Sequence, residues 1–230
     1  MASRHTDSEY EAELRELREH LLLMAGRVES MIAGATRALI EHNADLARET
    51  IAADARVDRD EVELDDLCLR ILAKRQPVAS DLRSVTLTLK MVTDIERIGD
   101  LAVNICERVI DLAAESPLKP YEDTPRMGEL ARAMLGDAID AFVSRDIAKA
   151  RAVIAHDAEI DALYTRVFRD VLAIMVRDPQ AIERGIHIQS IAKWIERIGD
   201  HTTNLAEEVI FLVEGTDVRH QGRRSPPPAS

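Results

Sequence analysis

The stretch Ile95-Glu96-Arg97-Ile98-Gly99-Asp100 occurs again, letter for letter, at residues 195–200. Beyond this block, four further pairs at the same spacing of 100 residues are identical: Asn104 and Asn204, Glu107 and Glu207, Val109 and Val209, Ile110 and Ile210. Ten identities in sixteen positions indicate an internal duplication. In each copy a Glu and an Asp stand four residues apart, so on a helix the two carboxylates share a face.

The composition predicts an all-α protein. Apolar residues make up 46% of the 230 residues, which is enough for a core, whereas aromatic residues make up only 3%. Strands favour aromatic and β-branched residues, but this chain is rich in Ala, Leu, Ile, Glu and Arg. The length and the duplication together favour two domains of about 100 residues each.

The formal net charge of −12 argues against a general nucleic-acid binder, which would normally be basic. No apolar run approaches the ~20 residues needed to cross a membrane, and the N-terminal stretch has no apolar signal core. Cys68 and Cys106 are interpreted as reduced thiols of a cytosolic protein. We therefore expect a cytoplasmic protein without direct membrane insertion.

Apolar residues recur every three or four positions from about Ser8 to His42, which predicts a helix. The remaining helices are predicted at about 46–74, 80–114, 126–143, 146–177 and 179–214. These helices form two tandem antiparallel three-helix bundles, an all-α fold. The predicted domains are a first bundle at 8–115, a proline-rich linker at 116–125, a second bundle at 126–214 and a disordered tail at 215–230.

The second helix of each half carries a carboxylate pair of its own: Asp54 and Asp58, and Asp157 and Asp161. Residues equally far from the turn of an antiparallel hairpin lie at the same level. Asp58 and Glu96 each lie 19 residues from Pro77, and Asp54 and Asp100 each lie 23 residues from it. The second hairpin has the same symmetry about its own break, between residues 178 and 179. Each hairpin is therefore expected to gather four carboxylates.

Four carboxylates at one level repel one another, by roughly 4 kcal/mol for a pair about 4 Å apart at an effective dielectric near 20. We therefore expect divalent or trivalent metal ions at these positions, with magnesium, manganese, calcium, iron and zinc all open. Asn104 and Asn204 are possible additional ligands through their amide oxygens. Gly99 and Gly199 cost ~1 kcal/mol each in a helix interior, which suggests close approach of a helix or a ligand.

Ordinary ion pairs are the alternative interpretation, because Arg97 and Arg197 can neutralise the neighbouring Glu and Asp residues. Glu61 and Asp65 continue the first carboxylate stripe, but the second half has Tyr164 and Phe168 at their positions. We interpret Glu61 and Asp65 as part of a solvated face.

His156 and His201 adjoin candidate ligands but point about 90° or more away around their helices, so neither is expected to bind metal. The bundles contain no Glu-x-x-His pair, no glycine-rich phosphate loop and no nucleophile with a recognisable base. We expect no catalytic residue and no organic cofactor. A metal-dependent hydrolase or oxidase, and a purely structural scaffold, remain the alternative functions.

The chain resembles the PhoU family over about residues 8–222. The resemblance rests on AKRQPVASDLR at 73–83, on the two ERIGD blocks with the Asn that follows each, and on GTDVRH at 215–220. It implies two three-helix bundles and metal clusters bound through paired acidic motifs. The residues that match these motifs are Asp54, Asp58, Glu96, Asp100, Asp157, Asp161, Glu196 and Asp200.

The resemblance also implies a function. Members of the family are signalling adaptors that negatively regulate phosphate uptake and the phosphate-starvation response, without enzymatic activity. They link the ATPase subunit of the phosphate ABC transporter to the sensor histidine kinase of the phosphate regulon, and homodimers are common. We therefore expect a cytoplasmic protein that is peripheral to the inner membrane through these partners.

Overall fold

The computed structural model describes residues 2–77, 79–118 and 123–215, and every regular element in these ranges is a helix. The elements in chain order are α1 (Ala2–Glu41), α2 (Ala44–Arg75), α3 (Ala79–Ala113), α4 (Asp123–Ser144), α5 (Ile147–Arg177), the 3-10 turn η1 (Pro179–Ala181) and α6 (Ile182–Glu214). The all-α prediction is confirmed. The first helix begins at Ala2, six residues before the predicted start at Ser8.

The predicted turns lie where local chemistry places them. The side chain of Asn43 caps α2 by accepting hydrogen bonds from the backbone N–H groups of Asp45 and Leu46, at 3.1 and 3.0 Å. Asp146 caps α5 in the same way by accepting from the N–H of Lys149. Asp178 caps η1, and a proline opens that turn, where no backbone donor is required.

Helix α3 ends at Ala113 and α4 begins at Asp123, so the segment between the repeats lies two to three residues earlier in the sequence than the predicted 116–125. Pro125 lies in the first turn of α4, where its missing N–H would have had no partner within the helix. Residues 119–122 of the linker lie outside the described residues. So does the predicted tail, apart from Gly215.

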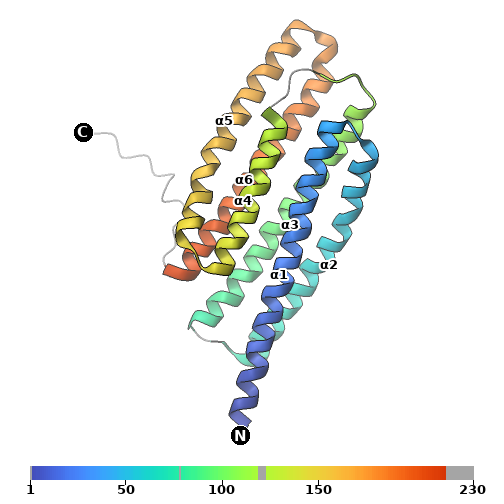
Figure 1. The fold of residues 1–230 in the computed structure, drawn as a ribbon. Coiled ribbons are helices and arrows are strands. Elements are labelled where there is room, and N and C mark those ends of the chain that lie inside the picture. Colours follow the sequence, from blue (N-terminus) through green and yellow to red (C-terminus); the bar gives the residue numbers. More distant parts are fainter. Residues whose placement is uncertain (1, 78, 119–122, 216–230) are drawn as a thin grey trace, which may run out of the picture.

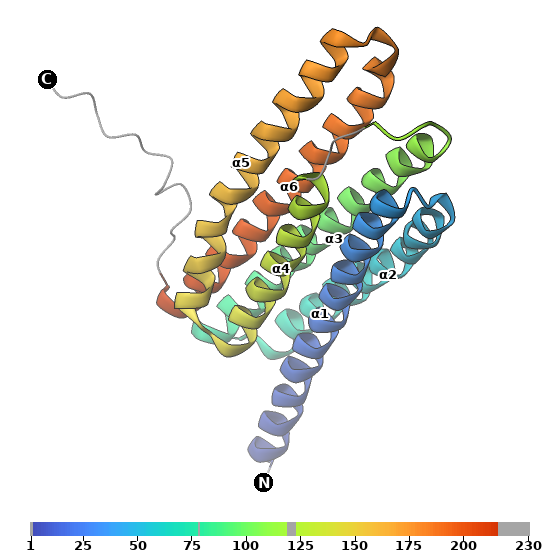
Figure 2. The same ribbon diagram turned by 45° about the horizontal axis from the view of Figure 1, so that its top comes forward.

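The two repeats form antiparallel three-helix bundles, α1–α3 and α4–α6, that pack side by side (Figure 1). Helix α3 packs along α6 and α1 packs along α4, an arrangement that the turned view of Figure 2 also shows. Buried side chains from both repeats join in one hydrophobic core, which includes Ile98 of α3 and Ile198 of α6. The bundles are therefore in contact along their length and not only joined in tandem.

The core explains the role of the two cysteines. Cys68 and Cys106 are buried free thiols, and burial raises the pKa of each to about 12, so they serve as small apolar side chains. None of the helices in the described ranges is both long enough and apolar enough to span a membrane.

Candidate metal centres

The first group of candidate ligands lies between α2 and α3, and we call it the α2–α3 cluster. Its members are Asp54, Asp58 and Glu61 of α2 and Glu96 and Asp100 of α3. Asp54 Oδ1 lies beside the backbone of α3, 3.4 Å from the place that a Cβ atom on Gly99 would take. The predicted matching of levels across this hairpin therefore brings the carboxylates of the two helices together.

Burial and, after it, mutual repulsion raise the pKa of the central carboxyls in the α2–α3 cluster. Burial, followed by the neighbouring charges of Asp58 and Asp100, raises the pKa of Asp54 to about 6. Burial and then the charge of Asp100 raise the pKa of Glu96 to about 7, and Arg97 only partly offsets them. Negative charge is thus under-compensated here, which is the condition that a bound cation would relieve.

Within this cluster, Glu96 is the carboxylate whose negative charge most lacks a partner. Its Oε2 atom is buried and accepts no hydrogen bond from any described residue, although the Nε atom of Arg97 lies 3.5 Å away. The Arg97 side chain is 58% exposed and divides its charge between Glu96 and Asp100. A long, solvated ion pair of this kind contributes little and leaves the inner oxygen of Glu96 without a donor.

The interpretation of Glu61 and Asp65 as a solvated face is wrong. Both are half-buried, and burial followed by the charge of a neighbouring carboxylate raises the pKa of each. The charge of Glu61 also acts on Glu96 across the hairpin. The signal was present in the sequence, because Asp58, Glu61 and Asp65 follow one another at helical spacing; the absence of acids at the equivalent positions of the second repeat hid it.

The second group, which we call the α5–α6 cluster, consists of Asp157, Asp161, Glu196 and Asp200. Asp157 Oδ1 lies 3.4 Å from the place of a Cβ atom on Gly199, the same distance as in the first repeat. Lys193 binds Glu196, with 2.6 Å between Nζ and Oε2, and Nζ also lies 5.4 Å from the centroid of the Tyr164 ring. The second cluster therefore contains a cation supplied by the protein itself.

The alternative interpretation was that Arg97 and Arg197 form ion pairs with the neighbouring acids. It is confirmed for Arg97 only. Arg97 contacts both acids of its own motif, at 3.5 Å from Glu96 and 3.2 Å from Asp100. Arg197, its counterpart, forms no ion pair with any residue that the structure describes. In the second repeat the cation that pairs with the motif glutamate is Lys193. Comparison of the two repeats does not predict it, because the first repeat has Thr93 at the equivalent position.

Two of the more peripheral residues are engaged elsewhere. Asn204 donates a hydrogen bond of 3.3 Å to Asp94 Oδ1 on α3, and the Nδ1 atom of His201 lies 2.8 Å from the same oxygen. Asn204 therefore faces the other bundle and not the carboxylates of α5. His156 lies 3.9 Å from Glu159. Asn104 is half-buried on α3 and remains a possible ligand.

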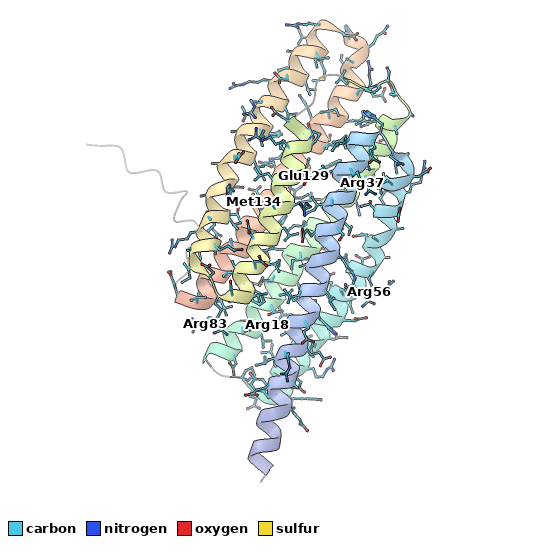
Figure 3. All side chains as sticks on the ribbon, in the orientation of Figure 1. Arg18, Arg37, Arg56, Arg83, Glu129 and Met134 are labelled. Carbon is cyan, nitrogen blue, oxygen red and sulfur yellow. The ribbon has the colours of Figure 1, made fainter. Side chains whose placement is uncertain are left out.

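A surface hollow of about 1020 Å³ lies away from both clusters, between α1, α2 and α4. Figure 3 labels three residues of its wall: Arg37 on α1, Arg56 on α2 and Glu129 on α4. Its wall includes none of the predicted metal ligands. A guanidinium nitrogen of Arg56 lies 2.9 Å from Oδ1 of the buried Asp60, so part of the positive charge of this wall is already neutralised.

The carboxylate clusters fit metal binding by donor chemistry and charge. Among the described residues no three Asp, Glu, His or Cys side chains stand close enough together to hold one ion, so binding requires the carboxylates to rotate inward. Asp and Glu side chains on helices can do so without moving the backbone. The donors are oxygen atoms only, which suits hard or borderline cations, and Glu96 Oε2 is a buried acceptor without a donor.

Two repeated three-helix bundles, each with carboxylates gathered between its second and third helices, define a class: a duplicated all-helical protein with paired acidic centres. The family model described as "PhoU domain" matches this chain twice, at residues 21–109 and 124–209. These two matches correspond to the two bundles. The chain belongs to the PhoU family.

Individual relatives agree with this assignment. A phosphate-specific transport system accessory protein PhoU homolog from Pseudomonas putida is 42% identical over 220 residues, covering 95% of this chain and 86% of the relative. The phosphate-specific transport system accessory protein PhoU from Escherichia coli K12 is 34% identical over 220 residues, covering 96% and 91%.

Solved structures show the same fold. The crystal structure of PhoU from Pseudomonas aeruginosa matches with a TM-score of 0.87 and 39% identity, covering 90% of this chain and all of that one. The phosphate transport system regulatory protein PhoU from Streptococcus pneumoniae matches with a TM-score of 0.84 and 27% identity, covering 91% and 99%. The PhoU-like architecture expected from the sequence is confirmed.

Proposed function

We propose that this chain is a regulatory accessory protein of a phosphate-specific transport system, and that it binds metal ions at its carboxylate clusters. The family assignment supports the regulatory role, because relatives that align over nearly the whole chain are named as accessory proteins of such a system. The under-compensated carboxylates of the α2–α3 cluster are the observation that carries the metal-binding part.

The bound ions would act on the hairpins. Carboxylates from α2 and α3, and from α5 and α6, would share an ion and so tie neighbouring helices together at one level. The ion supplies positive charge to a place where the protein itself supplies little. This neutralisation rigidifies each hairpin and presents a defined charged patch to a partner protein.

The partners that we propose are the ATPase subunit of the phosphate transporter and the sensor histidine kinase. In this scheme the chain is cytoplasmic, reaches the membrane through these partners, forms a homodimer and catalyses no reaction. It represses phosphate uptake and the starvation response when phosphate is plentiful. Support for this scheme comes from the family resemblance and from the names of the aligned relatives.

Elemental analysis of the purified full-length chain tests the metal-binding part. Glu96→Ala and Glu196→Ala remove one central carboxylate from each cluster, and we expect at least one of them to lower the metal content. Glu16→Ala, at an exposed position of α1, is the control and should leave the metal content unchanged. Equal metal content in the wild type and in both cluster variants would exclude the clusters as metal sites.

Co-purification with the transporter ATPase subunit, and separately with the kinase, tests the adaptor role. We expect both complexes to form, and a chelator to weaken them if the ions shape the contact surface. A variant that lacks all eight predicted ligands separates the alternatives. Undiminished binding by that variant would favour a structural scaffold, whereas metal-dependent turnover of a phosphoester or a peroxide by the wild type would favour an enzyme.

A further inference from the structure

The two carboxylate clusters differ at two aligned positions. The offset of 100 residues that aligns the two IERIGD blocks places Lys193 of α6 opposite Thr93 of α3. The offset of 103 residues that aligns Asp54 with Asp157 places Tyr164 of α5 opposite Glu61 of α2. Both differences lie beside the aligned glutamates Glu96 and Glu196, one on each helix of the hairpin.

In the second repeat these two residues act on the same ammonium group. The Nζ atom of Lys193 lies 2.6 Å from Oε2 of Glu196 and 5.4 Å from the centre of the Tyr164 ring. The ring face attracts a cation, and the carboxylate forms a short charge-assisted hydrogen bond with it. A carboxylate of α6 and a ring of α5 thus hold one positive charge between the two helices.

In the first repeat the same two positions add negative charge and supply no cation. Glu61 contributes a further carboxylate whose charge acts on Glu96. The hydroxyl of Thr93 donates to the carbonyl oxygen of Leu89, at 3.3 Å, within its own helix. The buried Oε2 atom of Glu96 consequently accepts no hydrogen bond from a described residue.

We propose that the α2–α3 cluster is the principal metal-binding site, and that Lys193, steadied by Tyr164, occupies the equivalent position of the α5–α6 cluster as a built-in cation. This inference rests on the metal binding proposed above. An ion entering the α5–α6 cluster has to displace an ammonium group from its carboxylate and finds one carboxylate fewer. An ion entering the α2–α3 cluster meets only Arg97, whose 58% exposed side chain lies 3.5 Å from Glu96 and 3.2 Å from Asp100, longer contacts than the 2.6 Å between Lys193 and Glu196.

The divergence continues along the same face. Asp65 follows Glu61 on α2, whereas Phe168 follows Tyr164 on α5, and the Tyr164 and Phe168 rings lie 6.4 Å apart in a tilted arrangement. The second repeat therefore carries two rings at positions where the first repeat carries two carboxylates. The ring nearer the cluster contacts Lys193, so these differences all make the second cluster less favourable for an added cation than the first.

Titration of the chelator-treated full chain with Mn²⁺, followed by isothermal calorimetry and by the loss of the free-ion electron paramagnetic resonance signal, tests the proposal. We expect a tight component that disappears when Glu96 and Asp100 are both changed to their amides. The same component should persist when Glu196 and Asp200 are changed to theirs. Circular dichroism of each variant controls for folding.

Exchanging the two positions between the repeats gives a matched pair of variants. Lys193→Thr with Tyr164→Glu should tighten Mn²⁺ binding at the α5–α6 cluster by roughly tenfold or more. Thr93→Lys with Glu61→Tyr should weaken binding at the α2–α3 cluster by a similar factor. Lys193→Gln keeps most of the side chain and removes only the charge, so it tests the same point if the double variant folds poorly.

The outcomes distinguish this inference from the proposal beneath it. Equal affinity at the two clusters of the wild type, unchanged by Lys193→Gln and by the exchange, would overturn the inference and leave metal binding intact. Absence of Mn²⁺ binding at either cluster in every variant would overturn both. A tight first site, together with a second site that tightens when Lys193 loses its charge, would support both.

Discussion

Asp54 of α2 lies against Gly99 of α3, with its Oδ1 atom 3.4 Å from the place that a Cβ atom on the glycine would occupy. The side chains of Val57 and Val28 lie 3.5 and 3.6 Å from the same place. All three distances are ordinary van der Waals contacts, so a methyl group fits there without moving the helices. Close helix packing therefore does not by itself require glycine at this position.

Gly99→Ala is expected to stabilise the metal-free protein by about 0.5–1 kcal/mol, because alanine loses less backbone entropy than glycine in a helix. The added methyl group would also restrict Asp54, and we expect Mn²⁺ binding to weaken. Urea denaturation in chelator and calorimetric titration measure the two effects.

Gly26→Ala is the matched control, since Gly26 lies inside α1 and a Cβ atom there would have no neighbour within 4 Å. It should give a similar gain in stability and leave ion binding unchanged. If both variants bind Mn²⁺ as the wild type does, Gly99 is not adapted to a ligand.

The stability of the metal-free protein should depend on pH through Asp54 and Glu96. Folding raises their pKa values from 3.8 to about 6 and from 4.5 to about 7. As the pH rises the unfolded chain releases these protons first, so the contribution of each group is complete below its unfolded pKa and is lost as the pH rises through its folded pKa. As the pH rises from about 4 to about 7, the loss of these contributions therefore progressively lowers the free energy of unfolding.

Glu96→Gln isolates this effect, because the amide has a similar shape and does not titrate. We expect the stability of the variant relative to the wild type to increase from pH 5 to pH 8 when denaturation is measured in chelator. Glu16→Gln provides the comparison at an exposed position of α1. A relative stability of Glu96→Gln that stays constant over this range would contradict the raised pKa of Glu96.

The contact between Asp94 and His201 joins the two bundles. We expect it to contribute to the free energy of unfolding and not to metal binding. Asp94 Oδ1 lies 2.8 Å from His201 Nδ1 and accepts a hydrogen bond from Asn204. His201→Ala should cost about 1–2 kcal/mol of stability and leave the metal content unchanged.

A double-mutant cycle with Asp94→Ala measures the coupling between the two side chains. We expect the double variant to lose less stability than the sum of the two single losses. Loss of metal from His201→Ala at full folding would show instead that this histidine is a ligand.

The packing of α1 against α4 depends on Gly128. A Cβ atom on this residue would overlap the Oγ1 atom of the buried Thr36. Gly128→Ala should therefore lower the free energy of unfolding by about 1–3 kcal/mol through overpacking, despite the better helix propensity of alanine.

Thr36→Ala removes the atoms that the new methyl group would strike, so it should restore much of the lost stability when the two changes are combined. Thermal unfolding of the two single variants and of the double variant measures this rescue. A harmless Gly128→Ala would mean that the two bundles do not pack at this point as closely as described.

Much of the candidate site could be read from spacing. Asp54 and Asp100 were placed at one level by counting from Pro77, and the charge of Asp100 indeed acts on Asp54. That inference succeeds because the rise per residue of a helix is constant. Glu61 was misjudged because the effect of its charge on Glu96 is recognised only when side-chain direction, and not level alone, is known.

The sequence alone determined the duplication, the predicted helix ranges, the breaks at Pro77 and between residues 178 and 179, and the acidic stripe of each hairpin. The duplication follows from direct comparison of the two copies in the sequence. The helices, their breaks and the acidic stripes depend on residues within a few turns of one another, so periodicity and helix-breaking residues are sufficient to predict them. The tertiary structure decided that the bundles share one core, that Asp94 meets His201, and that Lys193 faces Tyr164. These contacts join side chains of different helices, and they depend on how each helix is rotated about its axis and packed, which local pattern does not specify.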